Sequence, residues 1–377
     1  HFQALSAALS ATIGLGNIGG VALAISLGGP GAVFWMWMVG IVGMALKMTE
    51  VTQSMIYRNA SDPDNPHGGP MFVVSQGLTQ MNPALKSLGR WIGYVFCVTL
   101  MVSTVTGGNM FQAWNVADVT NEYFGVAGWV TGVILTLIVG SVLIGGIKRI
   151  GKVAGVLVPV MVMIYVIAGI YVLLQNYEQI PELLQLIIVS AFVPTEATGA
   201  FIGGTMGSAF LFGMKRAIFS NEAGQGSSAI AHAAAKTDEP VREGLVGGLE
   251  PFIDTIVVCT FTALIILSTG IWNRAPDIGF DEPPNAVQRE GIWRFSDTQL
   301  PPGEWQNQEA LMMVVQADPN KATEQNIHRV GGIINQTGSG FVATWQPFRS
   351  ELQPKIIGDG FYQDHVGATL TAKAFDT

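Results

Sequence analysis

The feature that most constrains this chain is a series of seven long apolar segments within its first 272 residues. They lie at about 4–27, 31–53, 91–114, 126–147, 153–174, 196–214 and 244–271. A helix of about 20 apolar residues crosses the ~30 Å hydrocarbon layer of a membrane. Charged residues make up 12% of the chain, which is about half of what a soluble domain usually carries. We therefore predict an all-α polytopic membrane protein, with the lipid bilayer as its surroundings.

The basic residues indicate how the segments are oriented. Residues 1–272 contain 11 Lys and Arg, and all of them fall at or near the connections after the second, fourth and sixth segments. The other connections carry acidic residues instead. Because short cytoplasmic loops are enriched in Lys and Arg, the start of the first segment and these three connections are predicted to face the cytoplasm. The stretch after the seventh segment is then outside.

Residues 273–365 have a different composition, without a spanning run and with 12 acidic against 7 basic residues. Short strands are expected near 310–315 and 331–334, with Trp293, Trp305 and Trp345 as seeds of a small core. We interpret this stretch as a compact extracytoplasmic insertion; the alternative is a loosely ordered loop. Small and apolar residues resume in 366–377, which we interpret as the start of a further transmembrane helix. Because the first residue is His1, we interpret the chain as part of a longer protein.

The first segment contains a glycine-rich stretch near its middle, ATIGLGNIGG at 11–20. Glycines at this density disfavour a continuous helix, and irregular backbone at membrane depth is tolerated where it lines a cavity. A break exposes N–H groups that attract a carboxylate and carbonyl groups that coordinate a cation. The alternative is a glycine face for tight helix packing. Asn17 favours a break, because an amide inside a membrane needs a partner.

A second interruption lies at 199–207 in the sixth segment and includes Gly203, Gly204 and Thr205. The first and sixth segments are five apart in order and cross the membrane in opposite senses. Glycine-interrupted segments at corresponding places in two halves indicate a substrate site between inverted repeats. No repeat is evident at the level of individual residues, so this symmetry rests on segment order.

A polar run follows Lys215 and Arg216 and contains Ser220, Asn221 and Glu222. By depth it lies near the cytoplasmic face. One interpretation is an inner gate. The other is a helix-capping turn with Ser220 as the N-cap.

Two further polar pairs lie inside apolar segments. Asn109 and Gln112 are three residues apart and share a helix face, where they contact either a ligand or a neighbouring helix. Asp254 and Thr255, together with Asn17 of the first segment, offer the oxygen ligands that a hard cation such as sodium prefers. A carboxylate within a span indicates a functional site, and the alternative for Asp254 is a salt bridge to Lys236 or Arg242.

Other classes of function lack support in the residues. The chain has no clustered His and Cys set, nucleophile motif or phosphate loop, and therefore no sign of an enzyme or of a bound cofactor. Cys97 and Cys259 are interpreted as buried free thiols, and His67 and His232 as isolated structural residues. No basic patch indicates a nucleic-acid partner.

Several stretches resemble the alanine/glycine:cation symporter family. They are SAALSATIGLGNI at 6–18, GGPGAVFWMW at 28–37, GGPM at 68–71, GGIKRI at 145–150, FSNEAG at 219–224 and HAAAKTDEPVREG at 232–244. The resemblance covers 1–272 and resumes at 367–376. Family members usually lack so long an insertion before the second of these regions, and the first helix and last three helices of the family fold are absent from this chain.

The resemblance implies a leucine-transporter-type fold of two inverted five-helix repeats, with the second repeat incomplete here. It implies symport of a small neutral amino acid such as alanine or glycine with sodium or a proton, in a cell membrane, expected to be a bacterial inner membrane. It places Thr12, Gly14, Gly16, Asn17 and Gln112 at the substrate. An ion channel, a membrane enzyme, and a sensor whose insertion binds a ligand are the competing classes.

Overall fold

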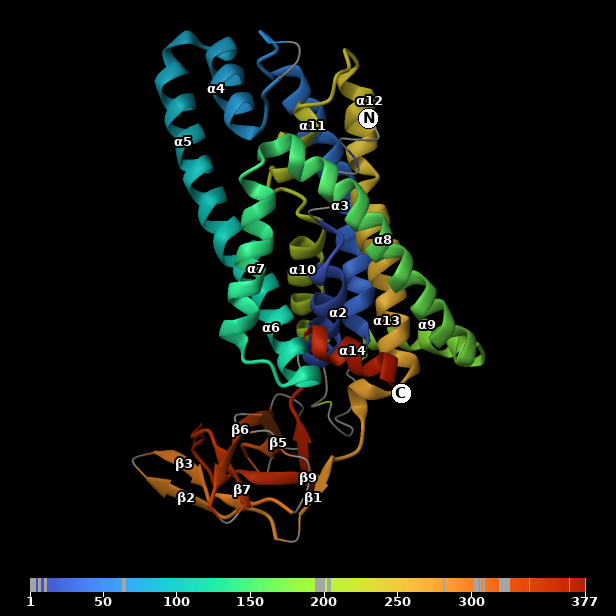
Figure 1. Ribbon diagram of the computed structural model, residues 1–377, viewed down its shortest axis with the longest axis vertical. Helices are drawn as coiled ribbons and strands as arrows, with labels where there is room; N and C mark the ends of the chain where they lie inside the picture. The colour runs from blue at the N-terminus through green and yellow to red at the C-terminus, as the bar shows by residue number, and fades with distance from the viewer. Residues whose placement is uncertain are drawn as a thin grey trace.

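The computed structural model of this chain describes residues 5, 8–9, 12–62, 66–193, 201, 205–280, 282–289, 291–301, 305, 307, 309–318, 326–338, 340–365 and 367–376. These residues form a bundle of long helices with a β-sheet part at one end (Figure 1). The bundle is helical as predicted, and the all-α description does not extend to the stretch after the last long helix, which forms β-sheets.

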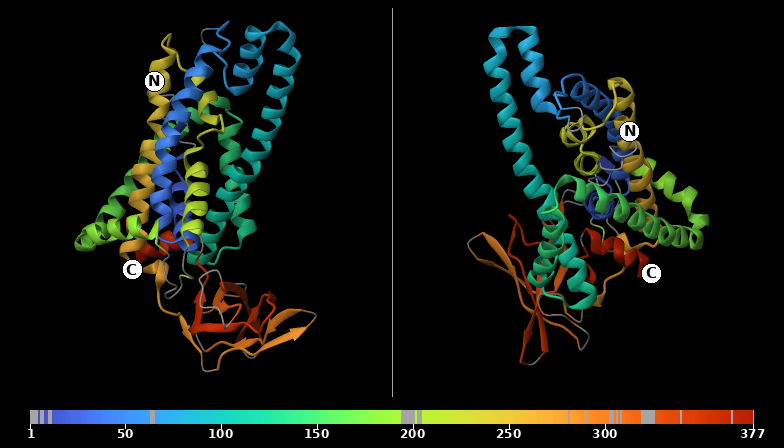
Figure 2. Two further views of the ribbon diagram at one scale, coloured as in Figure 1. Left: turned by 180° about the vertical axis from the view of Figure 1, so that it is seen from behind. Right: turned by 45° about the horizontal axis from the view of Figure 1, so that its top comes forward.

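The bundle is built from helices of very different lengths. In chain order they are α2 (Leu15–Gly28), α3 (Gly31–Ile56), α4 (Pro70–Met81), η1 (Pro83–Leu85), α5 (Lys86–Ser103), η2 (Thr104–Met110), α6 (Phe111–Phe124), α7 (Gly128–Leu143), α8 (Gly146–Gln175), η3 (Tyr177–Gln179), α9 (Ile180–Ser190), α10 (Met206–Asn221), α11 (Ser227–Ala233), α12 (Pro240–Gly248), η4 (Phe252–Val258), α13 (Cys259–Ser268) and η5 (Ile271–Asn273). Two of these, η2 and η4, are π-helical turns within longer helices. Helix α4 and the start of α5 form a pair that stands off from the other helices (Figure 2).

Several of these helices have the dimensions of membrane spans. Among the described residues, four helical stretches are long and apolar enough to cross a membrane: Gly31–Ile56, Pro83–Phe124, Lys152–Gln175 and Pro240–Ser268. They coincide with the predicted second, third, fifth and seventh segments. The first and fourth segments correspond to the shorter apolar helices Leu15–Gly28 and Gly128–Leu143. Large apolar side chains such as Val156, Ile164 and Ile167 of α8 are exposed, as expected for a surface that faces lipid.

The predicted bounds of the sixth segment need correction. Residues 194–200 and 202–204 lie outside the described residues, and α10 runs from Met206 through Lys215 and Arg216 to Asn221. The pair of basic residues does not end the helix. Lys215 is exposed and its ammonium lies 6.0 Å from the centre of the Phe212 ring. Long basic side chains can be held within a helix when their stems lie along apolar surface.

Helix α3 packs tightly against its neighbours through glycines. A Cβ atom at Gly31 would lie 2.2 Å from the Ser190 carbonyl oxygen, and one at Gly213 would lie 2.4 Å from the Ala32 carbonyl oxygen. Only glycine allows backbones to approach this closely, as in the small-residue interfaces of membrane helices. These contacts join α3 to α9 and to α10.

The insertion is a small β structure with its own core. A six-stranded sheet has the order β1-β9-β5-β6-β7-β4, and a three-stranded sheet has the order β2-β3-β8. The strands are β1 (Ile278–Gly279), β2 (Ala286–Arg289), β3 (Ile292–Phe295), β4 (Thr298–Gln299), β5 (Ala310–Gln316), β6 (Ile327–Thr337), β7 (Gly340–Trp345), β8 (Phe348–Arg349) and β9 (Lys355–Gln363). The stretches 310–315 and 331–334 expected as strands lie in β5 and β6, which pair antiparallel with Ala310 opposite Ile333. Leu311, Met313, Ile334, Trp345 and Phe361, which come from β5, β6, β7 and β9, are buried in one hydrophobic core.

Contacts join the insertion to the bundle at the end opposite α11 and α12 (Figure 1). Arg329 of β6 donates a 2.9 Å hydrogen bond to the Ser26 carbonyl oxygen at the end of α2. The chain then enters α14 (Ala368–Asp376), which lies across the end of the bundle. The Ala368 N–H bonds to Asn115 at 3.0 Å, and Lys373 pairs with Glu122 at 3.1 Å. These partners explain why the helix predicted at 91–114 continues to Phe124.

Candidate functional site

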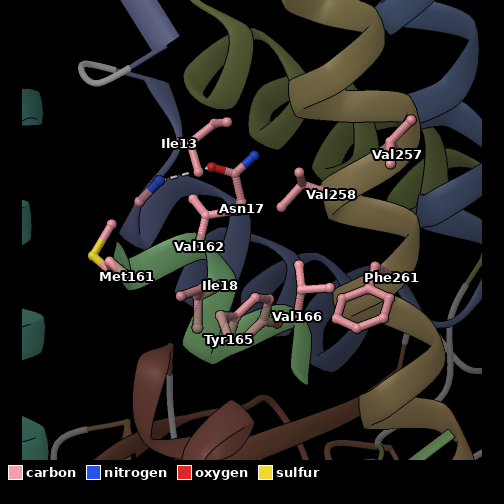
Figure 3. Close-up of a pocket in the computed structure, with 11 residues that line it drawn as sticks. Ile13, Asn17, Ile18, Met161, Val162, Tyr165, Val166, Val257, Val258 and Phe261 are labelled. Atoms are coloured by element: carbon pink, nitrogen blue, oxygen red, sulfur yellow. Dashed lines mark hydrogen bonds between the residues drawn. The ribbon is translucent and has the colours of Figure 1, made fainter. Parts of the chain in front are cut away.

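The first predicted segment bends at Ile13 and Gly14. Thr12 is helical, the next two residues form a bend, and α2 begins at Leu15. The Gly14 N–H donates a 2.9 Å hydrogen bond to Asn17 Oδ1, as Figure 3 shows. Asn17 thereby caps the new helix start. The first N–H groups of a helix have no partner within that helix, so this bend presents donors at mid-bundle.

The other end of the Asn17 amide meets a buried carboxylate. Its Nδ2 donates to Asp254 Oδ1 at 2.6 Å and lies 3.1 Å from the Asp254 carbonyl oxygen. Ser220 Oγ donates to Asp254 Oδ2 at 2.8 Å, and Thr255 Oγ1 donates to the same oxygen at 2.9 Å. Asn17, Asp254 and Thr255 are all fully buried. Residues of α2, α10 and η4 thus converge on one carboxylate.

Asn221 extends this network by one step. Its Nδ2 donates a 3.1 Å hydrogen bond to Thr255 Oγ1, and its Oδ1 accepts from the Ala223 N–H at 2.9 Å. Two of the residues considered for a gate, Ser220 and Asn221, therefore belong to the same network as the residues considered for a cation. The N-cap interpretation of Ser220 is wrong, because Ser220 lies in the last turn of α10. The turn there is made by Glu222, with φ 52°.

Among the residues that the structure describes, the hydrogen-bond partners of the Asp254 carboxylate do not include a cation. Asn17, Ser220 and Thr255 are all neutral donors. Arg242, one partner considered for a salt bridge, instead pairs with Glu239 at 3.0 Å on the surface. A buried ionised carboxylate that forms no direct ion pair costs on the order of several kcal/mol to hold away from water. Its environment therefore favours a bound cation or a proton.

A cleft of about 800 Å³ opens beside the bend. It lies between α2, the η2–α6 region, α8 and α10. Among the sequence candidates, its lining includes Thr12, Gly14, Gly16, Asn109, Gln112, Ser220 and Glu222. Gln225 and Ser227 also line it and were not singled out from the sequence. Their signal was the polar run that continues past Glu222 to 228.

A second cavity, of about 160 Å³, has Asn17 in its lining and is otherwise lined mostly by apolar side chains. Figure 3 shows it between the start of α2, α8 and the η4–α13 helix. Met161, Tyr165 and Phe261 are among its lining residues.

Three candidates stand apart from this arrangement. Thr205 does not line the cleft; its Oγ1 accepts the Ser208 N–H at 3.0 Å and caps α10. Gly203 and Gly204 lie outside the described residues.

Cys259, interpreted as a buried free thiol, is buried and free, and its Sγ lies 3.5 Å from Asn17 Nδ2. It is one helical turn beyond Thr255, a spacing that periodicity alone could have revealed.

Comparison with known proteins gives one consistent result. Residues 1–290 match the model of the sodium:alanine symporter family. The chain is 44% identical over 271 residues to the sodium/alanine symporter AgcS of Methanococcus maripaludis, which covers 72% of this chain and 58% of that protein. It is 37% identical to a sodium/proton-dependent alanine carrier protein of a Bacillus species, over 72% of this chain and 58% of that protein. It is 39% identical to the probable sodium/glutamine symporter GlnT of Bacillus subtilis, over 71% and 53% respectively. The chain thus spans somewhat over half the length of these relatives.

Proposed function

This chain belongs to the sodium:alanine symporter family, and on that premise we propose that it carries a small neutral amino acid across a membrane together with a cation. The family is one of transporters, which are not enzymes. The observation that carries the proposal is the fully buried Asp254 carboxylate beside the bend at Gly14, bonded only by neutral groups among the described residues. A buried carboxylate of this kind binds a cation, and the free helix N–H groups beside it attract the carboxylate of an amino-acid substrate.

For the substrate, we propose the cleft beside the bend. The carboxylate of the amino acid would accept hydrogen bonds from N–H groups at the start of α2, near Gly14 and Gly16. The side chains of Thr12, Asn109 and Gln112 would bond to the other polar groups of the amino acid. Gly203 and Gly204 would complete the site from the sixth segment. Relatives named for alanine and for glutamine support an amino acid as the class of substrate. Alanine or glycine is our choice within it.

For the cation, we propose Asp254, Thr255 and Ser220 as the oxygen donors. Their oxygens already point toward one another, at 2.8–2.9 Å from Asp254 Oδ2. Asn17 turns its NH₂ group toward Asp254 and its oxygen toward Gly14. We therefore propose that Asn17 connects the cation site to the bend. Its oxygen would coordinate the cation directly only after the amide group rotates. Sodium suits this set of hard oxygen ligands, and a proton on Asp254 is the second candidate.

We propose a multi-pass arrangement in a cell membrane, expected to be a bacterial inner membrane, with α11 and α12 at the cytoplasmic side. The insertion at 273–365 is then extracytoplasmic. The support is the placement of Lys and Arg near the connections at one end of the bundle. The insertion occupies the opposite end (Figure 1).

The test of transport is uptake of radiolabelled alanine and glycine into vesicles by the full-length protein. Saturable uptake that rises with an inward sodium or proton gradient is expected. Current without saturation would indicate a channel instead, and absence of uptake with either gradient would refute the proposal.

Gly16 provides a test of the substrate site. A Cβ at this position would lie 3.5 Å from the Ser220 Cα and 3.8 Å from the Phe219 ring. Gly16→Leu therefore places a larger side chain between α2 and α10, in the lining of the cleft. We expect uptake to be lost while membrane insertion stays normal, and the free energy of unfolding to fall by about 1–3 kcal/mol. Uptake at the parent's rate would show that the substrate binds elsewhere.

A further inference from the structure

A groove of about 290 Å³ lies between α4 and α5, away from the site described above. Two close backbone contacts join its walls. A Cβ atom at Gly89 of α5 would lie 3.0 Å from the Val74 carbonyl oxygen of α4, and one at Gly93 would lie 3.3 Å from the Met71 carbonyl oxygen. The two helices form a pair that stands off from the rest of the bundle, as Figure 2 shows. Because Tyr94 in its lining is 72% exposed, the groove opens to the surroundings of the protein.

The groove carries positive charge that its own helices do not balance. Arg90 is in its lining, and Lys86 lies one helical turn before Arg90. Neither side chain has a hydrogen bond or ion pair with a described residue. The stretch 65–117, which contains both helices, includes no Asp or Glu. An anion for Arg90 therefore does not come from α4 or α5.

Several other basic side chains near this end of the bundle are held by protein partners. Lys47 pairs with Glu250 at 3.0 Å, and His232 lies between the carboxylates of Glu243 and Glu250. The interpretation of His232 as isolated is wrong, because these two partners lie 11 and 18 residues further along the chain. Arg58 donates to three carbonyl oxygens at and beyond the end of α11. The groove differs from these places, since the described residues supply no partner for its basic group.

The position of Arg90 along α5 corresponds to the edge of a membrane. The apolar run predicted at 91–114 begins directly after it. Trp91 and Tyr94, the next two Trp or Tyr residues, are 64% and 72% exposed. Trp and Tyr gather at the level of lipid headgroups, where their rings meet apolar chains and their polar atoms meet water. These neighbours put Arg90 at the level expected for lipid phosphate groups.

Beyond Arg90, α5 offers an apolar surface that an acyl chain can follow. Tyr94, Val98 and Met101 come after Arg90 at intervals of three or four residues and so share its helix face. Val98 is 55% exposed and Met101 is 62% exposed. Inside the groove, the side chain of Phe72 adds apolar lining from α4. A basic group above an exposed apolar strip matches a phospholipid with a negatively charged headgroup.

We propose that the groove between α4 and α5 binds an anionic phospholipid from the membrane leaflet at this end of the bundle. Arg90 holds the phosphate, because a guanidinium donates to two phosphate oxygens at once. The Tyr94 hydroxyl, which has no hydrogen bond to a described residue, donates to the same headgroup, and Lys86 adds to the attraction. In a neutral phospholipid the headgroup's own ammonium offsets this attraction. The site is independent of the proposed transport function, because none of its lining residues lines the cleft.

The test counts the lipids that stay bound to the purified full-length protein, by native mass spectrometry, after titration with phosphatidylglycerol or with phosphatidylcholine of the same acyl chains. One phosphatidylglycerol should bind more tightly than phosphatidylcholine does. Arg90→Gln should weaken the binding of that lipid by about fivefold or more, the effect of one basic residue near a membrane surface. Arg242→Gln is the matched control, because Arg242 lies at the same end of the bundle, is 65% exposed and pairs with Glu239. It should keep the parent's affinity.

A second variant tests the groove itself and leaves its charge in place. Cys97→Phe puts a larger side chain into the lining, so it should also weaken the binding of phosphatidylglycerol. Equal binding of the two lipids, or the parent's affinity in both Arg90→Gln and Cys97→Phe, would overturn the proposal. An equal loss in Arg242→Gln would overturn it too, because the lipid would then respond to the charge of the whole bundle end. A protein dimer that Arg90→Gln dissociates, with no bound lipid, would show that a second copy occupies the groove and would refute the lipid site.

Discussion

Replacement of Asp254 by Asn tests the cation site most directly. The change preserves the side-chain volume and one carbonyl oxygen, and it removes the negative charge. In the structure, Asp254 Oδ1 accepts from Asn17, and Oδ2 accepts from Ser220 and Thr255. The Asn carbonyl oxygen can replace Oδ1, and the two hydroxyls can rotate to accept from the new NH₂ group.

Asp254→Asn is expected to change the apparent sodium affinity much more than the folding stability. A pair of unit charges about 4 Å apart interacts by about 4 kcal/mol at an effective dielectric constant of about 20. An amide oxygen retains part of this attraction, so we expect a loss of about 2–3 kcal/mol, or an apparent sodium affinity about 30- to 140-fold weaker. Loss of charged hydrogen bonds is offset by removal of a buried charge, so folding stability should change by no more than about 1 kcal/mol.

The assay is alanine uptake into vesicles as a function of sodium concentration at constant pH, with protein abundance and thermal unfolding measured on the same samples. Asp238→Asn is the control, because Asp238 is exposed in the turn before α12. An unchanged sodium dependence in Asp254→Asn would refute the assignment. A dependence on pH that disappears in Asp254→Asn, without any dependence on sodium, would indicate that the carboxylate carries a proton.

Three further outcomes are expected. Gly213→Val should destabilise the bundle by about 3 kcal/mol or more, because its Cβ would lie 2.4 Å from a carbonyl oxygen of α3; Gly132→Val, with nothing within 4 Å, should unfold at the parent's temperature. Lys86→Cys should react with an impermeant reagent only from the cytoplasmic side and Gln288→Cys only from outside, and the reverse would disprove the topology. Burial and neighbouring positive charges lower the pKa of His365 to about 4. Since this is below the unfolded value of about 6.5, stability is intact above about pH 6.5 and falls by up to about 3 kcal/mol toward pH 4; hydrogen exchange near β9 should show this fall, and His365→Gln should abolish it.

The sequence could predict the features that depend on composition and period. The long apolar runs that became α3, α8 and the α12–α13 helix follow from hydropathy, because a membrane requires continuous apolar length. The strands at 310–315 and 331–334 could be anticipated because apolar residues cluster there. The bend at Gly14 was indicated by local glycine density, which lowers helix stability regardless of tertiary contacts.

Predictions that depended on partners distant in the chain were less accurate. The end of α6 was placed too early because Asn115 and Glu122 read as polar loop residues, whereas α14 supplies their partners. Lys215 and Arg216 predicted a helix end because paired charges usually lie at the membrane surface, whereas α10 continues through them to Asn221. Thr205 was grouped with the ligand residues because of its glycine neighbours, and its hydroxyl is used as a helix cap.

From the sequence we predict a multi-pass membrane protein, and hydropathy identifies which stretches are apolar enough to span and which polar residues are unusual within them. Those properties are local, since hydropathy and helix propensity depend on neighbours within a few turns. The contacts of Asn17 and Ser220 with Asp254, and the place of His232 between Glu243 and Glu250, are visible only in the folded chain. Such contacts join residues up to 237 positions apart, and burial, which makes each polar group require a partner, is known only once the helices have packed.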